Sequence, residues 1–541
     1  MKKENQVKSK KKYTLRRKPN GENGLRLAKY WKRGIFSVIF SPLIFVLIWL
    51  LIQAFFMLIL SVFFGVVLDY YMIGGTTIIE LIVLIILFNS RMDSTAKLSW
   101  MLLISTMPYL GTMFYIWTKI EVGHRSIKKR LNLLIKNTRR MLIQNKETLN
   151  SLKKESHDSA SLAQYLYKID NCPVYNNTSV EYYPLGEEKF PAMLEELEKA
   201  EKFIFLEYFI IEEGYMWGNV LDVLARKAKC GVDVRVMYDG TCEFSTLPYY
   251  YPKRLARYGI KAKMWEPVKP VVTSSYNYRD HRKILVIDGK TAFCGGINLA
   301  DEYINRIERF GHWKDTAVKL KGPAVDSLTL MFLQMWNVKE KRPENFSQYF
   351  NHYENDEKAG GYVIPYAESP LNESKIAERV YMDILYTAQD YVYIMTPYLI
   401  LDDEMRTALC HAAERGVDVR LILPGIPDKK AVWYLAKRHY RVLLDSGVKV
   451  YEYTPGFVHA KVFLSDNIKA VVGTINLDYR SLYHHFECAV YMHGVSCLED
   501  IRKDFSFTLN KCRKVTYETI KKERIYVKLV GAVIKLFAPL L

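Results

Sequence analysis

The sequence predicts an α/β fold made of two related halves that follow an apolar N-terminal region. Three observations support this fold class. A His–Lys–Asp constellation occurs twice, segments typical of strands and helices alternate in the same order in both halves, and the first 120 residues contain long apolar runs. Alternating strands and helices form sheets that are joined by right-handed crossovers and covered by helices. We therefore expect the two halves to pack with a shared central cleft.

The N-terminal region predicts a membrane anchor. Residues 1–33 form a basic tail of cytoplasmic type, with thirteen Lys or Arg residues against two Glu residues. Apolar runs follow at 34–68, 71–88 and 98–118, and the first of them contains no charged residue. As one helix that run would extend about 52 Å, against a hydrocarbon core of about 30 Å. We expect two to four transmembrane helices within residues 34–121.

The number of spans stays open at this stage. Basic flanks on both sides of the apolar region favour two cytoplasmic ends and therefore an even number of crossings, whereas three runs give an odd number. Either one run lies in the interface or re-enters, or 34–68 forms a hairpin, or the tail is not cytoplasmic. The eight cysteines are scattered without a CxxC pair, which fits reduced thiols. We expect a multi-pass membrane protein with a cytoplasmic catalytic domain.

Positive charge is concentrated around the apolar region. Residues 122–160 carry ten basic against three acidic residues and alternate basic with aliphatic positions, which predicts a basic amphipathic linker at the membrane surface. With the tail, this linker accounts for almost all of the formal net charge of +19. A nucleic-acid enzyme would spread positive charge over its working face. We expect anionic membrane lipid as partner, and no nucleic acid; the alternative for the tail is a disordered solubilising segment.

The catalytic part divides into half 1, residues 161–345, and half 2, residues 346–541. The sequence of each half predicts a strand, a helix, a strand, a helix, a strand and the motif strand, in that order. In half 1 these elements are 203–211, 220–231, 232–239, 251–259, 261–266 and 281–288. In half 2 they are 391–400, 404–416, 417–424, 434–447, 448–453 and 459–466. Half 1 holds about seven extra residues, which we place in a loop at the site mouth. At the C-terminus, Lys521, Lys528 and Lys535 are spaced as in a basic amphipathic helix, either membrane-lying or packed on the core.

The duplicated motif reads H-x-K-x4-D, followed by a Gly fourteen residues and an Asn seventeen residues after the His. The two copies are separated by 178 positions, and such a matched pair indicates an internal duplication. The copies consist of His281, Lys283, Asp288, Gly295 and Asn298, and of His459, Lys461, Asp466, Gly473 and Asn476.

The residue types of this motif suit phosphodiester chemistry. Residues two apart on a strand share a face, so His281 and Lys283 point the same way, as do His459 and Lys461. Lysine is a compact cation for phosphate oxygens. One His can attack phosphorus while the other protonates the leaving alkoxide. Neither an HExxH motif nor clustered carboxylates accompany the histidines, so we expect no metal and no cofactor. The alternative is that both are core histidines at a sheet edge.

The two motifs resemble the HKD signatures of the phospholipase D superfamily. Surrounding segments such as FGHWKDTAVKLKGPAV, GVDVRLILPG and GTINLDYRSLYHHFECAV resemble bacterial cardiolipin synthases of the phospholipase D type, and the likeness extends over about residues 98–541. The resemblance implies a duplicated phospholipase D-like fold with two mixed β-sheets. It also implies a bacterial cell-membrane phosphatidyltransferase that joins two phosphatidylglycerol molecules and releases glycerol, without metal or nucleotide.

The resemblance also implies roles for single residues. His281 would be the nucleophile that forms a phosphatidyl-histidine, and His459 the general acid and then base, although the sequence itself leaves the reverse order open. Lys283, Lys461, Asn298 and Asn476 would bind the substrate phosphate. Asp288 and Asp466, although part of the catalytic motif, are expected to be structural. Asp315 and Glu487 would each orient the histidine of the other half; the alternative for both is a surface position.

Other functions remain in view. A phospholipase D hydrolase, or a transferase with a different alcohol acceptor, would share the covalent intermediate and differ in what reaches it. A pseudoenzyme scaffold is disfavoured because both motifs are intact, and a nuclease is disfavoured by the charge distribution.

Overall fold

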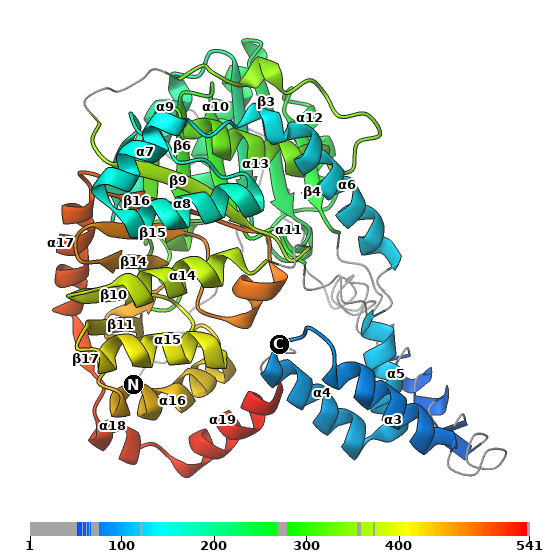
Figure 1. Ribbon diagram of the computed structural model, residues 1–541. Coiled ribbons are helices and arrows are strands. Elements are labelled where there is room, and N and C mark those ends of the chain that lie inside the picture. The colour runs from blue at the N-terminus through cyan, green and yellow to red at the C-terminus, as the bar shows by residue number, and fades with distance from the viewer. Residues whose placement is uncertain are drawn as a thin grey trace, which may run out of the picture.

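Two β-sheets, each covered by helices, form the body of the molecule (Figure 1). The computed structural model describes residues 51–66 except 53, 57, 61 and 64, and residues 75–119, 122–267, 278–353, 359–371 and 374–537. The first sheet has the order β1 (Ser179–Tyr183), β8 (Ala317–Lys321), β6 (Thr291–Gly295), β5 (Lys283–Ile287), β2 (Phe203–Tyr208), β3 (Asp233–Asp239) and β4 (Lys261–Trp265). The second has the order β17 (Cys512–Lys514), β12 (Lys449–Tyr453), β11 (Asp418–Pro424), β10 (Tyr391–Met395), β14 (Val462–Ser465), β15 (Lys469–Gly473), β16 (Glu487–His493) and β9 (Tyr362–Glu368).

The two sheets repeat one topology, which confirms the duplicated fold with mixed sheets. In the first sheet β2, β3 and β4 are parallel, and β5 pairs antiparallel with β2. In the second sheet β10, β11 and β12 are parallel, and β14 pairs antiparallel with β10. Both motif strands therefore occupy the same place at the centre of a sheet. Strand β17 is an addition at one edge of the second sheet.

The helices that were predicted between the strands are present. They are α10 (Tyr215–Lys229), α12 (Tyr251–Ala256), α15 (Asp403–Glu414) and α16 (Lys430–Asp445). The helices that were not predicted include α9 (Gly186–Glu198), α13 (Val325–Asn337), α14 (Ile376–Thr387) and α17 (Leu498–Leu509). Helix α13 packs against strands of both sheets, on β5 and on β9. It belongs to a core that joins the inner faces of the sheets and contains Ile284, Phe332 and Leu464.

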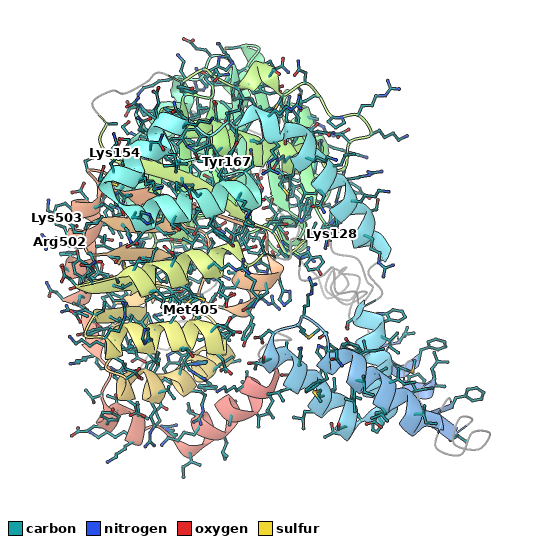
Figure 2. All side chains as sticks on the ribbon, viewed as in Figure 1. Lys128, Lys154, Tyr167, Met405, Arg502 and Lys503 are labelled. Carbon is teal, nitrogen blue, oxygen red and sulfur yellow. The ribbon has the colours of Figure 1, made fainter. Side chains whose placement is uncertain are left out.

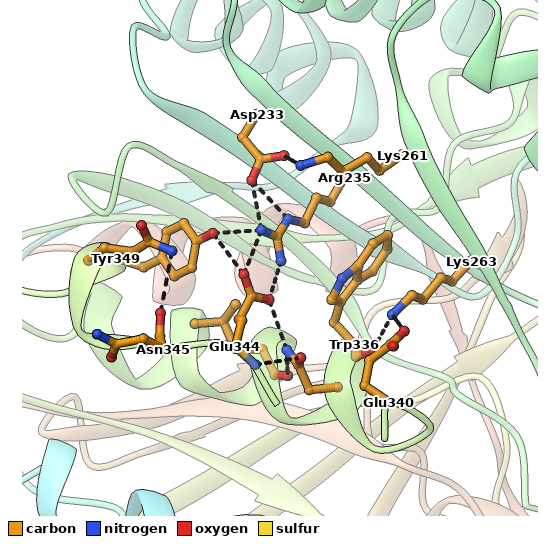
Figure 3. Close-up of polar contacts among 12 residues, drawn as sticks. Asp233, Arg235, Lys261, Lys263, Trp336, Glu340, Glu344, Asn345 and Tyr349 are labelled. Atoms are coloured by element: carbon orange, nitrogen blue, oxygen red, sulfur yellow. Dashed lines mark hydrogen bonds and ion pairs between the residues drawn. The ribbon is translucent and has the colours of Figure 1, made fainter. Parts of the chain in front are cut away.

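An ion-pair network connects the first sheet to the segment that leads into the second half (Figure 3). Arg235 on β3 pairs with Asp233 at 2.7 Å and with Glu344 at 2.5 Å, and it donates to the Tyr349 hydroxyl at 2.6 Å. Its guanidinium also lies 5.6 Å from the centre of the Trp336 ring. A buried arginine needs such partners because an unpaired charge is costly inside a protein. The network fixes the chain after α13 against the sheet.

The N-terminal helices form a small cluster beside the body (Figure 1). They are α3 (Gly75–Phe88), α4 (Ser94–Thr106) and α5 (Pro108–Lys119), which pack around Leu87, Trp100 and Tyr115. The apolar run 98–118 is therefore not one span, because Pro108 begins a new helix and cannot continue the hydrogen-bond ladder of α4.

The spans expected from the sequence were two to four. Among the described residues, no helix has both the length and the apolarity needed to cross a bilayer, so the multi-pass arrangement is not supported by them. The basic tail 1–33 and the start of the first apolar run lie outside the described residues.

The linker is folded onto the body. It contains α6 (Val122–Thr138), α7 (Lys146–Glu155) and α8 (His157–Asp170). Leu131 and Leu134 of α6 are buried in the core that includes α13, so the apolar face of α6 is covered by protein and its basic face is exposed. Figure 2 shows Lys128 of α6 between the body and the cluster α3–α5. Helix α8 packs on α14 and β9 of the second half.

The C-terminal segment folds into α18 (Tyr517–Lys521) and α19 (Ile525–Phe537). Helix α19 packs on α16, where Gly531 allows close approach: a Cβ atom there would lie 2.8 Å from the carbonyl oxygen of Tyr434. Its outer face is apolar and exposed, with Ile525 at 75%, Leu529 at 62% and Val533 at 58% exposure. The packed face agrees with the alternative of a helix that packs on the core, and the other face is exposed.

Candidate active site

Each motif histidine is held by the backbone of the opposite half. The sequence predicted both histidines on strands, but β5 begins at Lys283 and β14 begins at Val462, so both precede their strand. The amide of His281 donates to the carbonyl of Phe486 at 2.9 Å, and the amide of His459 donates to the carbonyl of Lys314 at 2.6 Å. The short parallel pair β7 (His312–Lys314) and β13 (Gly456–Val458) makes the second junction. The two histidines therefore sit at the seam between the halves.

The carboxylates pair with the histidines across that seam. His281 Nδ1 lies 2.9 Å from Glu487 Oε2, and His459 Nδ1 lies 2.6 Å from Asp315 Oδ2. Both carboxylates are fully buried, so the surface alternative for them is wrong. An Nδ1–H that donates to a carboxylate leaves the lone pair on Nε2, which is the arrangement that a nucleophile or a base requires. Neither half is complete without a side chain from the other.

The residue that lies against the orienting carboxylate differs between the two halves. Gly296 lies against Asp315 in the first half, and a Cβ atom at Gly296 would lie 2.1 Å from the Asp315 carboxylate. In the second half Thr474 lies against Glu487, and its hydroxyl donates to Glu487 Oε2. Glycine therefore leaves room for the carboxylate in one half, and threonine binds it in the other.

Burial favours the neutral form of both imidazoles. It lowers the pKa of His281 well below its usual value, and burial together with the nearby Lys461 lowers the pKa of His459 to about 4. Burial alone would raise the pKa of Glu487, but the paired His281 holds it below its usual value. Without substrate these shifts favour ionised carboxylates and unprotonated histidines, so an imidazole can attack; an anionic phosphate bound between the two histidines would favour the imidazolium form of the second one.

The motif lysines are buried beside the histidines. Lys283 Nζ donates to the carbonyl of His281 at 2.5 Å, and Lys461 Nζ donates in the same way to the carbonyl of His459. Burial lowers the pKa of Lys283 to about 8 and that of Lys461 to about 7. An ammonium group has three donors, so each lysine keeps donors for a phosphate oxygen. Partly desolvated cations bind an anion more strongly than solvated ones do.

The two asparagines are held differently. Asn298 accepts from the amide of Ile210 at 3.0 Å and donates to the Tyr303 hydroxyl at 2.7 Å. Asn476 is also buried, and among the described residues its Oδ1 has no hydrogen-bond partner. Asn298 is thus anchored to the protein and keeps one N–H for a ligand.

The motif aspartates lie at the far end of their strands. Asp288 accepts from the amides of Glu201, Lys202 and Phe203 at 2.7 to 2.8 Å. Asp466 accepts from the amides of residues 389, 390 and 391 at 2.9 to 3.1 Å. Each carboxylate joins the turn after a motif strand to the start of the neighbouring strand. Neither aspartate contacts a motif histidine, as expected for structural residues.

Several residues around the site carried no signal in the motif analysis. Lys189 of α9 is a further buried lysine, and burial lowers its pKa to about 8. Arg282, at the variable motif position, donates to the carbonyl of Glu487 at 3.2 Å. The rings of Phe209 and His485 lie 4.8 and 5.4 Å from that of His281. The absence of a motif explains why α9 was missed, whereas HHFECAV does place His485 two residues before Glu487.

Comparison with known proteins agrees with this architecture. The family model described as "Cardiolipin synthase, PLD-like domain" matches residues 193–336 and 381–508. A cardiolipin synthase of Alkalihalophilus pseudofirmus is 32% identical over 84% of this chain and 91% of its own length. A cardiolipin synthase of Geobacillus sp. is 31% identical over 90% of this chain and 98% of its own. An uncharacterized protein of Streptococcus mutans is 58% identical over 84% of this chain and 98% of its own.

Among solved structures, the phosphatidylserine synthase of Haemophilus influenzae shares the fold. It has a TM-score of 0.54 at 16% identity and covers 71% of this chain and 98% of its own. Two matched segments, one in each half, the crossed His–carboxylate pairs and relatives above 30% identity all agree. This chain belongs to the cardiolipin synthase family of phospholipase D-like enzymes.

Proposed function

We propose that this protein is a membrane-bound cardiolipin synthase that transfers a phosphatidyl group from one phosphatidylglycerol to another and releases glycerol. The observation that carries this proposal is the pair of crossed contacts, His281 with Glu487 and His459 with Asp315. Two equivalent, carboxylate-oriented imidazoles can act on opposite sides of one phosphorus atom, as a two-step displacement requires.

In the first step His281 Nε2 attacks the phosphorus of the donor lipid. The P–N bond forms while the bond between phosphorus and the glycerol headgroup oxygen breaks. The negative charge of the bound donor phosphate favours the protonated form of His459, and this imidazolium gives its Nε2 proton to that oxygen as glycerol leaves. Lys283 and Lys461 neutralise the charge on the non-bridging phosphate oxygens, and Glu487 stabilises the positive charge that develops on His281. A phosphatidyl-histidine remains.

In the second step a primary hydroxyl of the acceptor phosphatidylglycerol attacks the same phosphorus. Neutral His459 accepts the hydroxyl proton, the new P–O bond forms, and the P–N bond to His281 breaks. Cardiolipin leaves, and His459 is again protonated for the next donor. The sum is two phosphatidylglycerol molecules converted into cardiolipin and glycerol.

Membrane attachment is part of the proposal. Exposed apolar side chains gather on α3, where Ile82 and Ile86 are 50% and 58% exposed, and on α19, where Leu529 is 62% exposed. Both elements lie at the same end of the molecule (Figure 1), and the exposed Lys128 of α6 lies between the body and the cluster α3–α5 (Figure 2). Apolar side chains that are rimmed by basic ones favour an anionic lipid surface.

Product analysis tests the proposed reaction. Purified full-length protein is incubated with phosphatidylglycerol as sole lipid, and the products are identified by mass spectrometry. We expect cardiolipin and glycerol in equal amounts from wild type, none from His281→Ala or His459→Ala, and wild-type rates from His157→Ala, whose side chain is exposed on α8. Phosphatidic acid as the only lipid product would instead identify a hydrolase.

A further inference from the structure

A third histidine lies in the active site without a hydrogen bond. His485 is 7% exposed, and within the described part of the chain neither of its ring nitrogens has a hydrogen-bond partner. Its nearest acidic atom is Glu487 Oε1, at 3.7 Å from Nδ1, which is beyond hydrogen-bonding distance. Buried polar groups are normally satisfied, so an imidazole of this kind points to a ligand that the protein residues do not supply.

Among the described residues, only one oxygen of the neighbouring Glu487 carboxylate has hydrogen-bond partners. Glu487 Oε2 is bound by His281 Nδ1 and by the Thr474 hydroxyl. Glu487 Oε1 is buried and has no hydrogen-bond partner among the described residues. The unused oxygen and the unused imidazole face each other, with His281 alongside.

The duplication supplies an internal comparison. His485 stands two residues before Glu487, and Trp313 stands two residues before Asp315. The ring of His485 lies 5.4 Å from that of His281, and the ring of Trp313 lies 5.5 Å from that of His459. The two side chains are therefore equivalent in position, but an indole has no nitrogen lone pair for a cation. Among the described residues, only the His281 side of the seam has three potential ligands.

We propose that His281, His485 and Glu487 form an inhibitory binding site for a divalent transition metal such as Zn²⁺. One ligand atom from each residue lies within 4.8 Å of the others, and all three residues are buried. Two imidazoles and one carboxylate are a zinc ligand set that leaves a fourth position open. His485 Nδ1 and Glu487 Oε1, which have no hydrogen-bond partner among the described residues, would supply two of the ligand atoms.

The inhibitory effect rests on the proposed function, because it requires His281 Nε2 to be the attacking atom. A metal bound at His281 Nδ1 displaces the proton that Nδ1 donates to Glu487. In the neutral imidazole that single proton then resides on Nε2, so the lone pair needed for attack on phosphorus is lost. The metal also occupies Glu487, which would otherwise stabilise the charge on His281. Within the part of the chain that the structure describes, the His459–Asp315 pair has no third ligand, so the metal would leave that pair unoccupied.

Calorimetry tests the metal site independently of activity. Full-length protein in detergent is stripped with EDTA, dialysed and titrated with Zn²⁺. We expect wild type to bind one Zn²⁺ ion per protein molecule at this site. In His485→Trp, which introduces the tryptophan found at the equivalent position of the other half, binding should be at least tenfold weaker. The exposed control His157→Ala should bind Zn²⁺ as wild type does. His485→Asn serves the same purpose if the larger substitution unfolds. Equal affinities for wild type and both His485 variants would overturn the proposal.

An activity assay tests the consequence of binding. Zn²⁺ is added to each protein, and inhibition is measured relative to that variant's own metal-free rate. We expect wild type to be inhibited and then restored by EDTA, with the inhibitory concentration raised at least tenfold in the His485 variants. Binding to wild type without inhibition would contradict the effect on Nε2. A protein that binds Zn²⁺ through His485 but makes no cardiolipin would refute the proposed function and leave the metal site standing.

Discussion

At the scale of single residues, the site depends on burial of groups that would be charged in water. Burial lowers the pKa values of the imidazoles and the ammonium groups. Burial alone would raise the pKa values of Glu487 and Asp315, but the neighbouring histidine and lysine side chains lower them. The motif residues could be identified from sequence because they recur at fixed spacing. His485 and Lys189 could not be assigned, because each belongs to only one half and its burial depends on tertiary packing.

Neutralising an orienting carboxylate should slow the chemistry more than it weakens binding. In Glu487→Gln and Asp315→Asn the shape is kept, but the charge that supports the imidazolium and fixes its tautomer is lost. We expect kcat to fall on the order of 10²–10⁴-fold with KM changed little. Steady-state kinetics in mixed micelles measure both. A rise in KM at constant kcat would mean that these side chains bind substrate instead.

The lysines should set the alkaline limb of the pH profile. Burial lowers the pKa of Lys461 to about 7 and that of Lys283 to about 8, and both must be protonated to bind phosphate. As pH rises through these values the ammonium groups lose their protons, so kcat/KM should fall between about pH 7 and 8. Lys461→Arg, which stays charged, should shift the limb upward if it retains activity. A kcat/KM that is flat to pH 9 would contradict this role.

At the scale of elements, alternation of hydrophobic character predicted the strands and the helices between them, because both sheets are central and their pattern is strong. The face of a helix was harder to predict. The aliphatic positions of α6 were expected to meet a membrane, but Leu131 and Leu134 pack on α13. An amphipathic pattern shows that one side is covered and does not show by what. The break between α4 and α5 was visible as Pro108, but its effect on a span was underestimated.

The motif aspartates should affect stability more than chemistry. Asp288 accepts three backbone amides where β5 meets the start of β2, and its own φ of 54° marks a tight turn. Asp288→Ala leaves these donors without partners, at a cost of about 1–3 kcal/mol. We expect a lower Tm with nearly unchanged kcat per folded molecule. An unchanged Tm with lost activity would show that Asp288 takes part in catalysis.

At the scale of the whole molecule, the proposed attachment to a lipid surface rests on the basic face of α6 and the apolar faces of α3 and α19. Juxtamembrane basic residues contribute about 1 kcal/mol each near an anionic leaflet. The separation of charge along the chain supports the same proposal, since the catalytic halves carry little net charge. The relative placement of the helices could not be predicted, because it depends on contacts between distant segments such as α19 and α16.

Neutralising the basic face should weaken activity where phosphatidylglycerol is scarce. Replacing Arg125, Lys128, Lys129 and Arg130 by Gln should lower the rate on vesicles with a small fraction of phosphatidylglycerol, whereas detergent micelles should restore it. High salt should produce the same loss in wild type, because exposed charges are screened. Identical rates for the variant and wild type at every lipid fraction and salt concentration would show that these residues do not recruit substrate.

The covalent intermediate is the central claim, and peptide mapping tests it most directly. The enzyme is quenched during turnover of phosphatidylglycerol, digested at alkaline pH to protect the P–N bond, and analysed by mass spectrometry. The account predicts a phosphatidyl group on His281, none in His281→Ala, and accumulation in His459→Ala when the donor carries a leaving group that needs no proton. A phosphatidyl group on His459 in wild type, or turnover without any histidine adduct, would contradict it.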